Sequence, residues 1–332
     1  MKMLKLLALL LSLCLISMVF FSCDSFTLSE TDNLETEPHE AGSIENGESF
    51  NNSSEHNSVE NSNSSTNSTE TGNLGTNKVE TDASETNKGY SEGLMFTSNG
   101  DGTCYVSGIG TCTDSEIIIP STSPEGENVI AIGGSAFANN EIIVSVTVPE
   151  GVVSIGERAF LNCNALVTVN VPSTVREIGN GAFSYSEKVA NVTIPEGVEI
   201  ISQNMFYGCT SLKSIVLPES LEKIDSHAFE LSGITDILIP DNVESIGSSA
   251  FEYCMLLKSV TIGSGVTSIN EDAFERCKGL QSVIFKNTSG WVREWGVSVV
   301  EEASISEEEL ADASIAAKYL SEDYSGNVWK RN

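Results

Sequence analysis

Residues 142–164 read IIVSVTVPEGVVSIGERAFLNCN, and the next 23 residues, 165–187, read ALVTVNVPSTVREIGNGAFSYSE. The two stretches share an apolar strand pattern, a proline, an Ile-Gly pair and an Ala-Phe pair at the same positions. The phenylalanine recurs at intervals of 23, 23, 23, 23, 22 and 23 residues, as Phe137, Phe160, Phe183, Phe206, Phe229, Phe251 and Phe274. A fixed period of this length predicts a solenoid, in which each repeat stacks on its neighbours to bury an apolar face.

Each repeat begins with a short alternating stretch, such as Val146-Thr147-Val148, that ends at a proline. Alternation with a period of two predicts a strand, and proline ends it because it cannot donate the next ladder hydrogen bond. A second apolar pair follows, and after it we expect a corner with left-handed backbone, because Gly, Asn and Asp tolerate that conformation. The corner residues are Gly133, Gly156, Gly179, Ser202, Asp225, Gly247 and Asn270. The phenylalanine rings should then form a buried spine along the axis.

The unit Leu-x-x-Val-x-Ile-Pro-x-x-Val-x-x-Ile-Gly-x-x-Ala-Phe-x-x-Cys resembles the BspA-type leucine-rich repeat of bacterial surface proteins over about residues 94–285. The resemblance implies a right-handed, β-rich solenoid of about seven 23-residue repeats, with a parallel sheet on the concave face and little helix opposite. It also implies adhesion to host matrix proteins, host cells or other bacteria. Met205 in place of Ala, Gly263 in place of Pro and an insertion after Pro120 depart from the unit without interrupting it.

The N-terminus reads as an export signal over residues 1–22, with Lys2 and Lys5 ahead of an apolar core. The run ending at Ser22-Cys23 resembles a bacterial lipobox, with Phe20 where that family usually has Leu. The resemblance implies that Cys23 becomes the first mature residue and carries acyl chains, palmitate among them. Two or more such chains would tether the protein stably to a membrane. The alternative is a short uncleaved membrane anchor.

Residues 23–92 are dominated by Ser, Asn, Thr, Glu and Gly. Such a segment cannot bury enough apolar surface to offset the entropy of ordering it, which predicts a disordered acidic stalk. Residues 93–119 then predict a capping hairpin around the turn Asn99–Gly102. We interpret Asn99 and Asp101 as turn residues rather than calcium ligands, because the remaining spacing of a known calcium loop is missing.

The solenoid is expected over 120–285 and a C-terminal cap over 286–332. Ser306 and Glu309 form a capping box that predicts a helix to about Leu320. The three tryptophans of the chain, Trp291, Trp295 and Trp329, all lie in this last segment. We interpret them as covering the apolar end of the last repeat, which solenoids need for solubility. The alternative is an aromatic ligand platform.

Cysteine usage indicates buried thiols rather than a disulfide framework. Four of the eight cysteines stand three residues after a repeat phenylalanine, as Cys163, Cys209, Cys254 and Cys277. Residues two coils apart are separated by about 10 Å, which is too far for a disulfide. Small buried fillers are the favoured interpretation, although Cys254 and Cys277 lie in adjacent coils and could pair. For Cys104 and Cys112, near the hairpin, a disulfide and two free thiols remain equally open.

Catalytic, metal and cofactor sites are not predicted. The three histidines are His39, His56 and His227, and no Ser-His-Asp set, ligand cluster or phosphate loop can be assembled around them. The net charge of −30 argues against nucleic acid as a partner. These observations favour a binding protein over an enzyme.

The predicted binding surface is the outward side of the strand that precedes each proline. Its residue pairs are Ser145 and Thr147, Thr168 and Asn170, Asn191 and Thr193, Ser214 and Val216, Asp236 and Leu238, Ser259 and Thr261, Ser282 and Ile284. Val216 and Leu238 would form a small apolar patch on a face of hydroxyls and amides, either as a binding centre or as ordinary strand formers. The candidate binding residues are Thr193, Ser214, Val216, Asp236, Leu238 and Thr261.

A line of acids follows the strands, as Glu150, Glu196, Glu219 and Asp241. It would favour a basic partner segment or weakly bound cations, or it would simply keep this edge soluble. The sequence therefore predicts a lipid-anchored protein of the bacterial cell envelope, exposed at the surface. As an adhesin it would bind a protein or glycan on a host cell or a neighbouring cell. The alternative is a non-adhesive envelope scaffold or a glycan-binding spacer.

Overall fold

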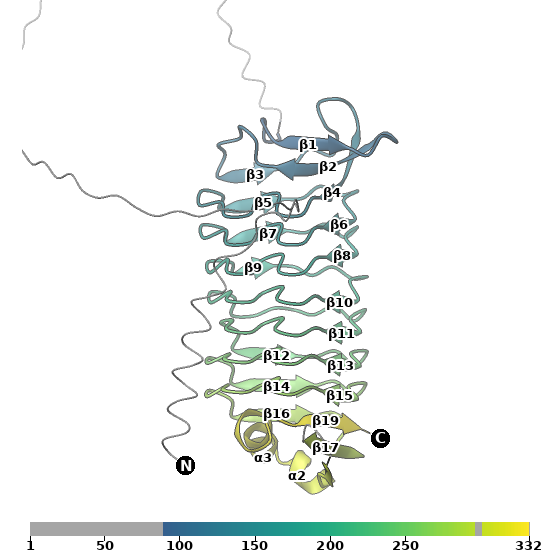
Figure 1. Cartoon of the computed structure of the whole chain (residues 1–332), viewed down its shortest axis with the longest axis vertical. Coiled ribbons are helices and arrows are strands. Elements are labelled where there is room, and N and C mark those ends of the chain that lie inside the picture. Colours follow the sequence, from purple (N-terminus) through teal and green to yellow (C-terminus); the bar gives the residue numbers. More distant parts are fainter. Residues whose placement is uncertain (1–88, 296–300, 332) are drawn as a thin grey trace, which may run out of the picture. The chain divides into compact units, whose positions relative to one another are not determined.

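The computed structural model describes residues 89–295 and 301–331, which belong to one compact unit. Cys23, the export signal and most of the predicted stalk lie outside the described residues. The described part is a β-solenoid whose coils stack along one axis (Figure 1). The repeat predicted from the phenylalanine spacing is confirmed. No helix in the described ranges is long and apolar enough to cross a membrane.

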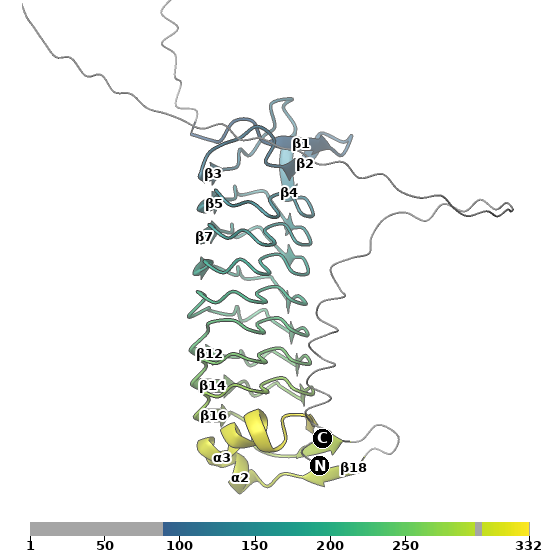
Figure 2. The same ribbon diagram turned by 60° about the vertical axis from the view of Figure 1, so that its left-hand side comes forward.

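Most coils contribute two short strands, and these strands form two columns along the stack (Figure 1). The first column contains β3 (Glu116–Ile118), β5 (Ser145–Thr147), β7 (Thr168–Asn170), β9 (Asn191–Val192), β12 (Asp236–Leu238), β14 (Ser259–Ile262) and β16 (Ser282–Phe285). The second contains β4 (Asn128–Ile132), β6 (Ser154–Ile155), β8 (Glu177–Ile178), β10 (Ile200–Ile201), β11 (Lys223–Ile224), β13 (Ser245–Ile246) and β15 (Ser268–Ile269). Neighbouring strands pair in parallel, with Val146 opposite Val169, for example. The stack bends little in either view (Figures 1 and 2), so we name its faces by their strands.

The third side of the coil, here called the turn face, is a stack of hydrogen-bonded turns. Alternate backbone amides donate to carbonyl oxygens of the next coil, as Arg158 does to Asn180 at 2.9 Å and Phe160 to Ala182 at 2.8 Å. Every turn contains left-handed residues both two positions before and two positions after its phenylalanine. The first set has φ between 54° and 60° and consists of Ser135, Arg158, Gly181, Asn204, His227, Ser249 and Asp272.

The predicted position of the left-handed corner is therefore wrong by two residues. Gly156 and Gly179, at the predicted corner, do not have positive φ. They are small because the coils approach closely there. A Cβ atom on Gly156 would lie 2.6 Å from the Gly134 nitrogen, and one on Gly179 would lie 2.5 Å from the Glu157 nitrogen. Glycine at these corners provides space between coils rather than a special conformation.

The core is the predicted spine of stacked phenylalanine rings. All seven rings are buried, and adjacent centroids lie 4.9 to 5.5 Å apart. Three residues after five of the rings, a thiol or hydroxyl donates to the preceding coil, as the Cys163 thiol does to the Phe137 carbonyl at 3.0 Å and the Ser186 hydroxyl does to the Phe160 carbonyl at 2.6 Å. All six described cysteines are buried free thiols, Cys104 and Cys112 included. Burial raises the pKa of the Cys163 thiol to about 11.

The hairpin predicted near the start is present as β1 (Met95–Ser98) and β2 (Thr103–Gly108), which pair antiparallel. The Asp101 carboxylate accepts hydrogen bonds from the Thr103 amide at 3.0 Å and hydroxyl at 2.6 Å, as a turn residue does. β2 then pairs in parallel with β4 and so joins the second column. Ser91, two residues before the expected start of the hairpin segment, is already buried and donates its amide to the Ile118 carbonyl.

The C-terminal segment lies across the end of the stack below β16 (Figure 2). It contains β17 (Trp291–Trp295), β18 (Glu301–Ser304) and β19 (Val328–Arg331), and β19 pairs antiparallel with β15. The predicted capping box opens α2 (Glu307–Ala311). The helix does not continue to Leu320, because the Asp312 carboxylate caps a new helix, α3 (Ala313–Lys318), which a π-helical turn η1 (Tyr319–Asp323) follows.

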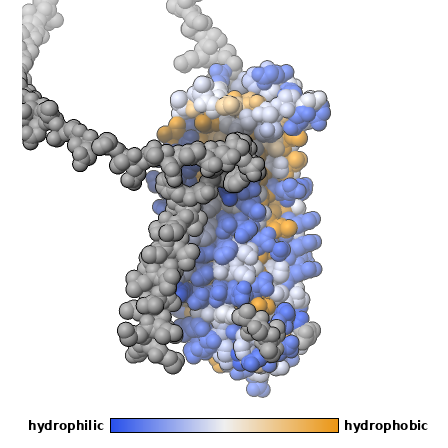
Figure 3. Space-filling model, viewed as in Figure 1, coloured by the Kyte–Doolittle hydropathy of each residue, from blue (hydrophilic) through white to orange (hydrophobic). Residues whose placement is uncertain are grey.

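Two of the three tryptophans lie in the core of this segment. Trp291 and Trp329 are each 1% exposed and pack on Phe285 with ring centroids 5.3 and 6.2 Å away. Rings buried in this way cover the last coil and are not free to serve as a ligand platform. Over the coils that Figure 3 leaves visible, the surface is mostly hydrophilic, with hydrophobic side chains in small spots.

Candidate binding surface

The outward side of the first column is arranged as the sequence predicted. Val146, Val169 and Val260 point into the core, while the residues on either side of them are at least partly exposed. The most exposed apolar side chains of this face are Val216 at 85%, Leu238 at 55% and Ile284 at 53%. The first two lie on adjacent coils in the middle of the array.

The first column is interrupted at this point. Its strands form two separate sheets, β3-β5-β7-β9 and β12-β14-β16, and the coil between them contributes no strand. That coil carries Ser214–Leu217 at the first-column position. Among the described residues, no hydrogen bond joins the backbone of Ser214–Leu217 to either neighbouring coil. The side chain of Ile215, which would be buried in an intact ladder, is only partly buried.

A hollow of about 310 Å³ lies at this interruption. Its lining includes Asn191 and Thr193 from one coil and Ser214 and Val216 from the next. The hollow therefore combines three features: backbone that is not paired with a neighbouring coil, an exposed apolar side chain and small polar side chains. An unpaired strand backbone is a template for pairing with another chain.

The second column is interrupted one coil earlier, between β8 and β10. At six of the seven corners the residue donates its amide to the preceding coil at 2.8 to 2.9 Å, namely Gly133, Gly156, Gly179, Asp225, Gly247 and Asn270. At the seventh corner the Ser202 hydroxyl donates to the Ile178 carbonyl at 2.6 Å. The hydroxyl thus occupies the acceptor that the amide uses elsewhere. A second hollow, of about 460 Å³, lies at this interruption.

The coil between the two interruptions, residues 189–208, is here called the middle coil. Its β9 pairs with the preceding coil, and its β10 pairs with the following one. The turn face remains continuous across it, since the Tyr185 amide donates to the Tyr207 carbonyl at 2.7 Å. The spine is also continuous, with 5.4 Å between the Phe183 and Phe206 centroids. Each junction of the middle coil therefore keeps the phenylalanine spine, the turn face and one of the two strand columns.

A shortened repeat lies one coil beyond the middle coil. The interval from Phe229 to Phe251 is 22 residues instead of 23. Gly233 allows the shorter turn, because a Cβ atom there would lie 2.0 Å from the Thr210 carbonyl oxygen. The short interval and Ser202 at a glycine position were the two sequence signals near the interruption, and sequence reasoning did not use either of them.

The structure brings most of the predicted site residues together at the interruption. Thr193, Ser214 and Val216 line the hollow, and Asp236 and Leu238 lie on β12 at the next coil. Thr261 lies one coil further, opposite Leu238 in the ladder, and is only partly exposed. The Asp236 carboxylate accepts a hydrogen bond from the Ser259 hydroxyl at 2.5 Å, which lowers its pKa below the usual value.

The line of acids has a structural role in the coil stack. The Glu196 carboxylate accepts the backbone amides of Glu219 and Ser220 on the next coil at 3.2 Å. Glu150 accepts the Ser173 amide at 3.3 Å in the same way. Carboxylates held by neighbouring amides fix the spacing between coils. No group of three or more His, Cys, Asp or Glu within the described ranges is arranged to hold a metal ion.

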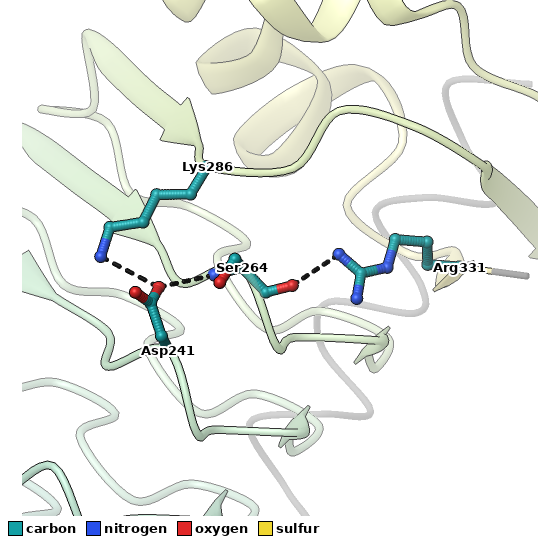
Figure 4. Close-up of polar contacts among 4 residues, drawn as sticks. All are labelled: Asp241, Ser264, Lys286 and Arg331. Atoms are coloured by element: carbon teal, nitrogen blue, oxygen red, sulfur yellow. Dashed lines mark hydrogen bonds and ion pairs between the residues drawn. The ribbon is translucent and has the colours of Figure 1, made fainter.

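Asp241 extends this arrangement to the C-terminal segment (Figure 4). Its carboxylate accepts the Ser264 amide at 2.8 Å and the Lys286 ammonium at 2.9 Å. Arg331 of β19 donates to the Ser264 carbonyl at 2.7 Å. The hydrogen bond from the Ser264 amide and the Lys286 charge lower the pKa of Asp241. Asp241 therefore links two coils to each other and to the end of the stack.

Comparison with known proteins agrees with this architecture. A model of the BspA type leucine rich repeat region matches residues 130–258, 177–296 and 244–312, which together span more than half of the chain. The fold is that of a leucine-rich-repeat solenoid. The chain belongs to the BspA-type leucine-rich-repeat family, whose members are typically cell-surface proteins that bind other molecules.

Similar solved structures come from several bacteria. The T. pallidum leucine rich repeat protein is 24% identical over 57% of this chain and 88% of its own, with a TM-score of 0.51. A leucine rich cell surface protein from Faecalibacterium prausnitzii is 27% identical over 58% of this chain and 69% of its own, with a TM-score of 0.45. No curated protein matches the chain.

Proposed function

We propose that the protein is a lipid-anchored adhesin that binds an extended polypeptide segment at the interruption of the first strand column. The observation that carries this proposal is the unpaired backbone of Ser214–Leu217, a segment that includes Val216, whose exposed fraction is 85%. Extended peptides bind exposed strand backbone through main-chain hydrogen bonds, and flanking side chains supply specificity. Ser214–Leu217 supplies both the unpaired backbone and a flanking apolar side chain, that of Val216.

The surrounding residues have the chemistry of a small protein interface. Val216 and Leu238 provide an apolar centre, and Thr193, Ser214 and Asp236 provide polar groups around it. Interfaces are commonly built in this way, with most of the binding free energy at the apolar centre. Thr261 completes the polar rim on the adjacent coil. The acidic character of the chain favours a ligand segment that carries basic residues.

The binding proposal is tested by capture of immobilised extracellular-matrix proteins by the full chain and by a Val216→Ser/Leu238→Ser double variant. We expect the double variant to lose most of its capture while its thermal unfolding changes little. Outward sheet substitutions change stability by about 1 kcal/mol or less. Ile284→Ser is the matched control, because Ile284 is an outward residue about as exposed as Leu238 and lies on β16, which pairs with β14.

If a folded double variant still captures as much matrix protein as the wild type, the binding site lies elsewhere. Equal losses in the double variant and in Ile284→Ser would show that the whole face contributes and that the interruption has no special role. If the wild-type chain captures none of the matrix proteins, the alternative of a non-adhesive envelope scaffold is favoured.

The lipid anchor is a separate part of the proposal and rests on Ser22-Cys23, where the predicted export signal ends. Replacing the acylated sulfur should release the protein, since anchoring depends on the acyl chains. We expect Cys23→Ser to move the protein from the membrane fraction to the soluble fraction of fractionated cells. Unchanged partitioning into detergent would show that another feature holds the protein.

A further inference from the structure

The turn face carries a third hollow at the level of the middle coil, with a volume of about 550 Å³. Sites for small ligands typically have volumes of about 300 to 1,000 Å³. Its lining includes two tyrosines and three amide side chains, contributed by Tyr185, Tyr207, Asn180, Gln203 and Asn204. We call it the tyrosine pocket. It lies on the turn face, apart from the first column, so it does not depend on the function proposed above.

One glycine, Gly181, lines this space in the otherwise regular turn face. Gly181 occupies the left-handed position that Arg158 and Asn204 fill on the neighbouring coils. Gly208 occupies the second left-handed position on the next coil, where a Cβ atom would lie 3.3 Å from the Tyr185 ring. Because non-glycine residues occupy the same position on adjacent coils, the backbone itself does not require Gly181. Its consequence is the missing side chain, which leaves the pocket open.

Tyr185 presents an open aromatic surface to the pocket. Its side chain is 50% exposed, and its ring packs on that of Tyr207 at 5.0 Å with a tilt of 60°. Tyr253 occupies the same position three coils further along, but there Arg276 covers the ring, with the guanidinium carbon 4.9 Å from the centroid. Arg276 also donates a hydrogen bond to the Tyr253 hydroxyl. Within the described part of the chain, no cation covers the ring of Tyr185 in this way.

The amides around the ring have free hydrogen-bonding capacity. The side chains of Asn180, Gln203 and Asn204 make no hydrogen bond within the described protein. Each amide offers two N–H donors and a carbonyl acceptor. At the rim Arg158 and Glu157 form an ion pair at 3.5 Å, so their charges largely cancel. The pocket is therefore polar, aromatic and close to neutral.

We propose that the tyrosine pocket binds a short neutral saccharide. The exposed ring of Tyr185 fits the apolar C–H face of a pyranose, since aromatic side chains combine an apolar surface with polar edges. The amides fit the hydroxyl groups around such a ring, which act as donors and acceptors in the same pattern. An anionic saccharide is disfavoured, because the chain carries a net charge of −30.

Saturation-transfer NMR on the full chain, held in a zwitterionic detergent that carries no sugar, tests the proposal. The probes are maltotriose, lactose and diacetylchitobiose, with sialyllactose as the acidic comparison, each at millimolar concentration. We expect transfer to at least one neutral probe. Tyr185→Ala should weaken its binding by about tenfold, the loss expected for removing one aromatic contact.

Two further variants separate the pocket from the fold. Gly181→Asn fills the pocket without removing any of its groups, and Asn is accepted at positive φ, as Asn204 shows on the next coil. This variant should abolish binding while its circular dichroism stays unchanged. Tyr253→Ala, at the same repeat position, should leave binding intact. The proposal is overturned if no neutral probe receives transfer, if only sialyllactose does, or if Gly181→Asn binds as the wild type does.

Discussion

The last coils and the middle coil have the same sequence pattern but differ in how they are held. β14 pairs on one side with β12 and on the other with β16, and inward Val260 and Val283 are buried. The middle coil is bonded through only one strand on each side, and inward Val192 is only partly buried. The difference shows that a coil can lose half of its strand pairing when the spine and the turn face remain continuous.

The comparison also shows that the two regions differ in what they leave available to a partner. In the last coils the backbone hydrogen bonds are used within the protein, and only side chains remain for a partner. At Ser214–Leu217 the backbone itself is available. The three hollows described above also lie around the middle coil. One is on the first column, one on the second column and one on the turn face.

The largest expected difference between the two regions is in amide hydrogen exchange. Amides of Ser259–Ile262 lie in an intact ladder and should exchange only when the solenoid opens, whereas those of Ser214–Leu217 have no partner in the described protein. Exchange rates should therefore differ by about three orders of magnitude or more, as between core strands and locally open segments. Mass spectrometry of the peptic peptides measures this, and equal protection of both segments would mean that the ladder is continuous in solution.

A second difference should appear when one phenylalanine ring of the spine is removed. Phe206→Ala and Phe251→Ala each leave a cavity and should lower the free energy of unfolding by about 3–5 kcal/mol. Only Phe206→Ala removes the ring that joins the two halves at the middle coil. We expect its urea transitions followed by tryptophan fluorescence and by circular dichroism to separate, because Trp291 and Trp329 report only on the C-terminal half. Coincident transitions in both variants would show that the halves are coupled by other contacts.

The acids at the first-column edge and on the turn face should respond to pH in opposite directions. The pKa of Asp241 is lowered from its ordinary 3.8 by the Ser264 amide and Lys286, so its ionised form stabilises the fold above that pKa. Burial and the charges of Asp272 and Glu252 raise the pKa of Glu275, so its ionised form opposes folding.

At pH 7 Asp241→Asn should therefore lower the melting temperature, and Glu275→Gln should raise it slightly. As the pH falls through the folded-state pKa of each carboxyl, its variant should converge on the wild type. For Asp241 this happens below pH 3.8, and for Glu275 it begins above the ordinary value of 4.5. Melting curves at pH 3 to 7 test both signs, and a shift of the same sign in the two variants would contradict this assignment.

The smallest expected effect concerns the corner at Ser202. Ser202→Gly removes the hydroxyl that occupies the Ile178 carbonyl and leaves the acceptor free for the amide, as at Gly179. The free energy of unfolding should change by only about 0.5 kcal/mol, but the amide of residue 202 should gain protection from exchange. Unchanged exchange at this amide would show that the hydroxyl does not cause the interruption.

Sequence reasoning predicted the period, the spine, the hairpin and the direction of the outward side chains. These features depend on which residues are apolar and how often they recur, because a repeat that carries an apolar face buries it by stacking on the next repeat. It also indicated Val216 and Leu238, because side-chain direction alternates along a strand. It placed the left-handed backbone at the wrong residues, because glycine marks close approach as well as positive φ, and the sequence does not distinguish the two reasons.

By itself, the sequence determined that this chain stacks 23-residue coils around a phenylalanine spine and which side chains face outward. Only the tertiary structure decided where the ladders stop. Ser214–Leu217 fits the repeat as well as Ser259–Ile262 does, but pairing depends on the distance between whole coils. The two departures from the repeat nearest this point are the Ser202 hydroxyl on the Ile178 carbonyl and the shortened turn at Gly233. The middle coil is therefore a property of neighbouring repeats packed together, which no single repeat encodes.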